Sequence, residues 1–202
     1  DLVFAGFEKQ LMVEDKGHLS TGLSGTYLMI QYLQSIERHD LIYSFAGKTT
    51  YPSWGYMLEN GATATWEHWE GVRSRIHNCY NNIGSWFIQG LAGIRPDPAK
   101  PGFKHAIIRP AFVDGIDYVN ASHDTLYGTI QSNWRRSADG VTMDVIIPAN
   151  STATVYVPAK AVSDVTVNGQ SLGEADHVTF VRMEKGRAVI EVGAGRYEFR
   201  AR

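Results

Sequence analysis

Residues Tyr51–Trp69 read YPSWGYMLENGATATWEHW and place three of the chain's five tryptophans close to two glutamates. A helix with one buried face needs apolar residues every three or four positions, and a half-buried strand needs strict alternation. From Gly61 to Trp69 neither pattern holds, because small residues lead into two tryptophans that enclose Glu67. Two interpretations stay open at this point. Flat rings beside a carboxylate suit a sugar site with proton transfer, and they equally suit a surface loop held by core tryptophans.

The composition is that of a folded protein with little net charge. The chain has 202 residues, 44% of them hydrophobic, and a formal net charge of −2, which suits one large or two small domains. Such a charge gives no broad positive surface for nucleic acid or acidic lipid, and no run approaches the roughly 20 apolar residues of a membrane span. We therefore expect no nucleic-acid partner and no membrane partner.

The first residues, DLVFAGFEKQ, lack both an initiator Met and the basic start of a signal peptide. We therefore expect the chain to begin inside a longer protein. Its compartment is left open.

Neither a metal nor a cofactor is expected from the motifs. Cys79 is the single cysteine, which excludes an internal disulfide and a cysteine-rich metal site. Its commonest role is that of a small buried hydrophobe. The seven histidines show no pair at zinc-site spacing, and no phosphate-binding glycine loop is present.

Two hydrophobic periods divide the chain near a proline-rich linker. Up to Pro96 apolar residues recur at helical spacing. Ser20 or Thr21 is a candidate helix cap, and Pro52 suits a helix start. After Pro101 the period becomes two, so we place a domain boundary in the linker, with residues 1–96 helical and residues 97–202 in strands.

The second half predicts short strands separated by turn signals such as Asp139-Gly140 and Lys185-Gly186. Strands at this spacing are typical of an antiparallel β-sandwich. The expected strands are Ala106–Arg109, Ile116–Ala121, Tyr127–Trp134, Val141–Ile147, Ala153–Val157, Val165–Val167, Val178–Val181, Ala188–Val192 and Arg196–Arg200.

Three motifs in order resemble the C-terminal portion of bacterial α-L-rhamnosidases of glycoside hydrolase family 78. They are HLSTGLSGTYLM (His18–Met29), the opening stretch Tyr51–Trp69, and NNIGSWFIQGLAGIRPDPAKPGFKHAIIRP (Asn81–Pro110). The resemblance implies an α+β chain in which residues 1–96 form the last hairpins of an (α/α)6 toroid, the fold of six-hairpin glycosidases. Residues 97–202 would be the C-terminal antiparallel β-sandwich.

The resemblance also implies hydrolysis of terminal α-L-rhamnosyl bonds with inversion. Glu67 matches the family's general base, and His77 matches a histidine of the sugar pocket. Trp54, Trp66 and Trp69 match aromatic positions that form the pocket wall or support it. The implied partners are a rhamnose-containing glycoside or polysaccharide and the rest of the catalytic domain upstream.

Some positions depart from the family pattern. Ala64 stands where the family often has a second threonine, His68 stands where it often has arginine, and the segment from Trp69 to His77 is short. The family's general acid lies upstream, and no residue here matches it, so we expect the isolated chain to be inactive. Two alternatives remain, namely a toroid glycosidase acting on another sugar and a non-catalytic carbohydrate-binding or structural module.

Overall fold

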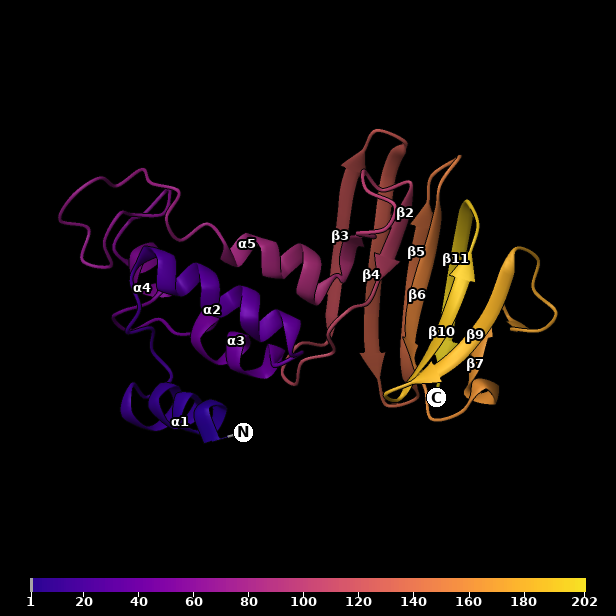
Figure 1. Cartoon of the computed structure of the whole chain (residues 1–202), viewed down its shortest axis with the longest axis horizontal. Coiled ribbons are helices and arrows are strands. Elements are labelled where there is room, and N and C mark those ends of the chain that lie inside the picture. Colours follow the sequence, from indigo (N-terminus) through magenta and orange to yellow (C-terminus); the bar gives the residue numbers. More distant parts are fainter. Residues whose placement is uncertain (1) are drawn as a thin grey trace. The chain divides into compact units, whose positions relative to one another are not determined.

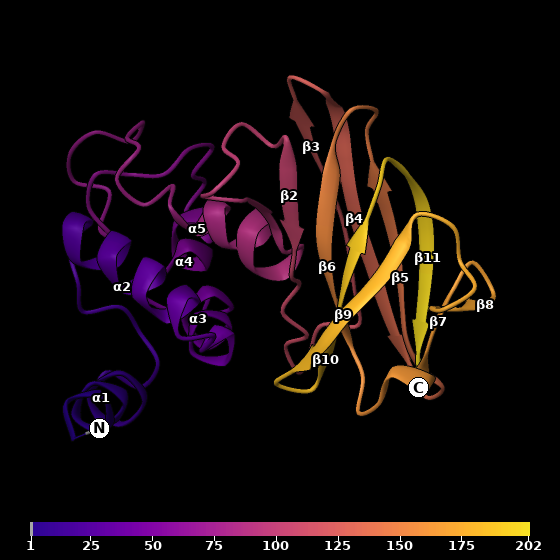
Figure 2. The same cartoon turned by 45° about the vertical axis from the view of Figure 1, so that its right-hand side comes forward.

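The structure, a computed structural model, describes residues 2–202 and divides into two compact units. The first unit is helical and ends at Trp86, and the second begins at Phe87 and consists mainly of strands. The division therefore falls inside a helix, while the sequence places the boundary after Pro96. Figures 1 and 2 show the two units from two directions.

The helical unit begins with α1, which continues into a π-helical turn, η1, and it ends just after α5, where a second π-helical stretch, η2, continues into the second unit. Among residues 2–202, no helix is long and apolar enough to cross a bilayer. The elements are α1 (Leu2–Lys9), η1 (Gln10–Glu14), α2 (Leu23–Ser35), α3 (His39–Ala46), α4 (Trp54–Glu59), α5 (Ile83–Ser85) and η2 (Trp86–Leu91).

The helix expected near Pro52 is present as α4, although Pro52 itself lies before the helix cap, and the predicted cap of α2 is wrong. Ser53 precedes α4, and its hydroxyl accepts the backbone N–H of Tyr56 at 2.9 Å. Helix α2 instead starts after Gly22, with no side-chain cap. The Thr21 hydroxyl lies 2.8 Å from that of Thr26, so it bonds to a side chain within the helix rather than to the helix's first peptide groups.

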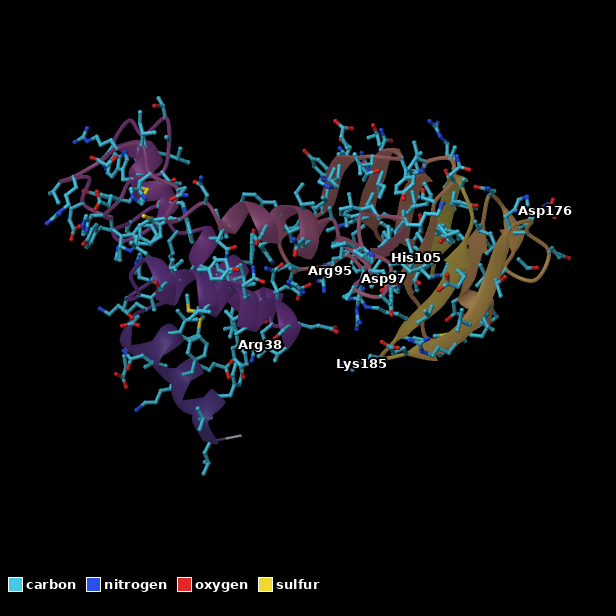
Figure 3. All side chains as sticks on the ribbon, turned by 45° about the horizontal axis from the view of Figure 1, so that its top comes forward. Arg38, Arg95, Asp97, His105, Asp176 and Lys185 are labelled. Atoms are coloured by element: carbon cyan, nitrogen blue, oxygen red, sulfur yellow. The ribbon has the colours of Figure 1, made fainter. Side chains whose placement is uncertain are left out.

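Helix α1 and the start of α3 are joined through Arg38, which is labelled in Figure 3. Its guanidinium donates to Glu8 at 2.6 Å and to Asp40 at 2.7 Å, and it lies 5.2 Å from the Phe4 ring centroid. The hydrogen bond from Arg38 lowers the pKa of Asp40. Asp40 is therefore part of a structural ion pair.

The second unit is a sandwich of two sheets, and it contains every strand expected from the sequence together with two short additional strands, β1 and β8. One sheet has the order β1-β2-β6-β10-β9, and the other has the order β3-β4-β5-β11-β7-β8. The strands are β1 (Ile94–Pro96), β2 (His105–Ile108), β3 (Tyr118–Thr125), β4 (Gly128–Ser137), β5 (Gly140–Ile147), β6 (Thr152–Pro158), β7 (Val165–Val167), β8 (Gln170–Ser171), β9 (Val178–Glu184), β10 (Arg187–Val192) and β11 (Gly195–Ala201).

Strand pairing in both sheets is antiparallel, except that β2 and β6 run parallel, with His105 opposite Thr152. Outside the apolar core this pair carries a buried polar contact, because the two ring nitrogens of His105 lie 2.6 and 2.8 Å from the hydroxyls of Thr152 and Thr154. A parallel pair needs a long crossover between its strands, and here the β3–β5 meander supplies it.

Alternating side chains of both sheets fill the core between them, including Ile130, Val145 and Phe199, each fully buried. Strand β4 also holds the residues through which the chain enters the sandwich, Leu91 and Ala92. The indole of Trp134 donates to the Leu91 carbonyl at 2.8 Å, and the Ser132 hydroxyl donates to the Ala92 carbonyl at 2.7 Å. These bonds explain why residues just before the linker belong to the second unit.

Replacing Ile130 by alanine should lower the sandwich's free energy of unfolding by about 2–5 kcal/mol, because it removes buried methylenes and leaves a cavity. Leu126→Ala is the matched control, since Leu126 is 96% exposed. Urea unfolding followed by circular dichroism measures both variants. Equal losses for the two variants would contradict the core assignment.

Candidate active site

The candidate residues lie mostly on the long connection between α4 and α5, which runs without helix or strand from residue 60 to residue 82 (Figure 1). Such a segment cannot be held by regular backbone pairing. Its order must come from side-chain packing and from individual hydrogen bonds.

A cluster of aromatic rings anchors the connection to the helices. The Trp69 ring stacks on Tyr80 with 3.9 Å between centroids and meets Trp54 nearly at right angles at 5.4 Å. The Trp54 indole donates to the Tyr80 carbonyl at 3.1 Å, and the Trp69 indole donates to the Thr21 carbonyl at 3.4 Å. The last residues of the connection are thereby fixed to α4, and its middle is fixed to the segment just before α2.

Trp66 is also packed inside the unit, with 3% of its surface exposed. Gly71 lies against the ring with φ of +69°, and a Cβ there would come within 2.7 Å of Trp66. The Arg75 guanidinium lies 5.1 Å from the ring centroid. Of the three candidate tryptophans, Trp66 and Trp69 are therefore buried and Trp54 is half-buried.

Glu67 is half-buried, with 29% of its side chain exposed. Its backbone N–H donates to the Ser74 carbonyl at 2.9 Å, and the Ser74 N–H lies 3.4 Å from its Oε2. Its Oε1 lies 4.0 Å from Nε2 of His68. A carboxylate that is oriented by a peptide group and still reaches solvent can accept a proton from water.

His77 is paired with Thr65 across the same connection. The His77 N–H donates to the Thr65 carbonyl at 2.8 Å, and the Thr65 hydroxyl donates to the His77 carbonyl. The imidazole Nδ1 accepts the Cys79 N–H at 3.2 Å, and the Cys79 sulfur lies against the same nitrogen. In the neutral ring this places the proton on Nε2, which also lies 3.6 Å from the Cys79 sulfur.

His77 and Cys79 line an open cavity of about 460 Å³ beside the start of α2. The remaining lining residues are Leu23, Ser24, Tyr27, Leu28 and Asn78. Burial and, to a smaller extent, the negative charge of Glu67 raise the pKa of Cys79. Cys79 is half-buried beside His77, so the expectation of a small buried hydrophobe is wrong.

Two further contacts could not be found from the sequence. The Tyr51 hydroxyl donates to Glu70 at 2.6 Å, which raises the pKa of Tyr51 to about 12 and lowers that of Glu70. The other contact is that of Arg75 with Trp66. Both join residues whose spacing carries no signal, because they meet only when the connection folds back on itself or against the segment before α4.

Replacing Gly71 by alanine should destabilise the helical unit by about 1–2 kcal/mol more than Gly61→Ala does. Both glycines have positive φ, so both variants carry the same backbone strain. A Cβ at Gly61 meets nothing within 4 Å, while one at Gly71 meets the Trp66 ring. Thermal unfolding compares the two, and equal costs would show that the Trp66 contact is unimportant.

Comparisons with known proteins agree on one family. Residues 8–91 match the model of the bacterial α-L-rhamnosidase six-hairpin glycosidase domain, and residues 93–171 match that of the bacterial α-L-rhamnosidase C-terminal domain. An α-L-rhamnosidase of Streptomyces avermitilis is 32% identical over 193 residues, which are 90% of this chain and 18% of that protein. One of an Alteromonas species is 39% identical over 153 residues, covering 70% of this chain and 16% of that protein.

Solved structures show the same fold. The crystal structure of the Streptomyces avermitilis α-L-rhamnosidase complexed with L-rhamnose superposes with a TM-score of 0.84 at 30% identity, over 95% of this chain and 19% of that one. The structure of the α-L-rhamnosidase from Dictyoglumus thermophilum superposes with a TM-score of 0.85 at 29% identity, over 97% of this chain and 22% of that one.

The chain spans about a fifth of the length of these relatives. It contains a match to the six-hairpin glycosidase domain followed by a match to the C-terminal domain. The chain belongs to the bacterial α-L-rhamnosidase family.

Proposed function

We propose that this chain supplies the general base and part of the sugar pocket of an inverting α-L-rhamnosidase. The observation that carries the proposal is Glu67, a partly exposed carboxylate oriented by the Ser74 peptide within the matched six-hairpin region. The relatives' names, and the L-rhamnose bound in one of their structures, support rhamnose as the sugar.

Inverting hydrolysis requires two carboxyl groups about 6.5–9.5 Å apart, with a water molecule between one of them and the sugar. Glu67 would take a proton from that water while the water oxygen attacks the anomeric carbon. The bond to the leaving oxygen breaks in the same step, and the second carboxyl group protonates that oxygen.

His77 is proposed to bind the sugar beside this base. In the neutral ring Nε2–H is the donor, 3.6 Å from the Cys79 sulfur, and His77 lines the open cavity near α2. A sugar hydroxyl is a suitable acceptor there. Trp66 and Trp69 are buried against other rings and backbone, so we assign them to support of the pocket. We assign the half-buried Trp54 to the same role.

The general acid is proposed to come from the rest of the catalytic domain. Several carboxylates in the helical unit already serve local bonds: Asp15 accepts the Ser20 hydroxyl, Asp40 pairs with Arg38, and Glu70 accepts the Tyr51 hydroxyl. None of these three has the apolar burial that keeps a catalytic acid protonated.

The isolated 202-residue chain should therefore show no turnover of an aryl α-L-rhamnoside, because one member of the carboxyl pair is missing. Release of the aryl group measured by absorbance tests this. If the purified chain turns over the substrate faster than a Glu67→Gln preparation does, the proposal that the general acid lies outside this chain is wrong.

In the complete enzyme, Glu67→Ala should lower kcat by about 10²- to 10⁴-fold while rhamnoside binding persists, as removal of a general base predicts. Azide should restore turnover of the aryl rhamnoside. Its nitrogen bonds to the anomeric carbon as the aryloxide leaves with the bonding electrons, giving a rhamnosyl azide of inverted configuration.

Glu59→Gln is the matched control, because Glu59 is an exposed glutamate at the end of α4. It should leave kcat near the wild-type value. A near-wild-type rate for Glu67→Ala would reject Glu67 as the base. Rhamnose binding by a wild-type complete protein without any turnover would favour a carbohydrate-binding module.

A further inference from the structure

Arg75 closes the short loop that carries Glu67. Its guanidinium covers the ring of Trp66, 5.1 Å from the centroid, and its Nε donates to the Gly71 carbonyl at 3.2 Å. One side chain therefore holds both the residue that precedes Glu67 and the turn of the loop.

The backbone pairing of Glu67 depends on the same closure. Trp66 and Glu67 are neighbours in sequence, as are Ser74 and Arg75, so the ring contact and the Glu67–Ser74 backbone pair fix a single register. The Ser74 N–H then faces Oε2 of Glu67. Displacing Arg75 would release Ser74, and with it the peptide group nearest to this carboxylate oxygen.

The loop has few other anchors. Residues 72–76 are all exposed, and Val72 and Ile76 leave 73% and 82% of their surface in solvent. No apolar side chain within residues 72–76 is thus buried in the unit. The side-chain restraints there are the Arg75 contacts with Trp66 and Gly71 and the bonds of the Ser74 hydroxyl with the Ile76 peptide groups, and of these only the Arg75 contacts reach outside residues 72–76.

Arginine suits this role better than lysine. Its planar guanidinium stacks on an indole and donates hydrogen bonds from its edge at the same time. An ammonium group can satisfy the carbonyl or lie over the ring, but it lacks the plane that does both.

We infer that Arg75 is a positioning residue that orients the Glu67 carboxylate through the Trp66 contact and the Ser74 peptide. The inference rests on the proposed role of Glu67 as general base. It concerns a residue that touches neither the water nor the sugar, and its effect should appear in kcat more than in KM.

The test is a double-mutant cycle in the complete enzyme with an aryl α-L-rhamnoside. Arg75→Met should lower kcat about tenfold with KM changed less than twofold, and Arg75→Lys should recover part of the loss. Arg73→Met, an exposed arginine in the same loop, is the matched control and should stay near wild type. In the Glu67→Ala background with azide, Arg75→Met should cause no further loss, because the carboxylate it orients is gone.

Hydrogen exchange gives a second readout of the same variants. The Glu67 amide, which donates to the Ser74 carbonyl, should exchange faster in Arg75→Met and should not in Arg73→Met. If Arg75→Met lowers kcat equally in the wild-type and Glu67→Ala backgrounds, or in neither, the role of Arg75 is wrong and the assignment of Glu67 as the base is unaffected. Full activity of Glu67→Ala without azide instead rejects the base, and the inference about Arg75 with it.

Discussion

The stacked rings of Trp69 and Tyr80, closed by Trp54, are the constraint on which the candidate site depends. The connection between α4 and α5 has no ladder of backbone bonds, so it loses conformational entropy without the usual compensation. Large rings bury much apolar area while fixing few torsions. Because Trp69 also donates to the Thr21 carbonyl and Trp54 to the Tyr80 carbonyl, the cluster orders the middle of the connection and its last residues.

Paired backbone contacts fold the connection back on itself. Thr65 faces His77, and Glu67 faces Ser74, so the connection doubles back on itself in a narrow loop. The base candidate and the sugar-binding candidate consequently lie on one folded segment rather than on separate helices. This arrangement lets a small number of side chains, Arg75 among them, control the orientation of the carboxylate.

The sandwich follows a simpler rule, and the sequence predicted it closely. Alternation in runs such as Met143, Val145 and Ile147 reports directly which side chains face the core, and all three are buried. The parallel pairing of β2 with β6 carries no such signal, because alternation defines a strand's two faces and not its neighbours. The position at which the chain enters the sandwich could not be predicted from the sequence either. It depends on bonds from Trp134 and Ser132 to carbonyls more than thirty-five residues away.

The sequence by itself determined the two-part architecture, the individual strands, the family and Glu67 as the carboxylate to consider, because periodicity and motif order are local properties of the chain. Only the tertiary structure decided that Trp66 and Trp69 are buried supports, that Cys79 lies against His77, and that Arg75 closes the loop around Glu67. Each of these contacts involves a side chain of the irregular connection. Such contacts have no fixed spacing in sequence, because they depend on how an irregular connection folds back on itself.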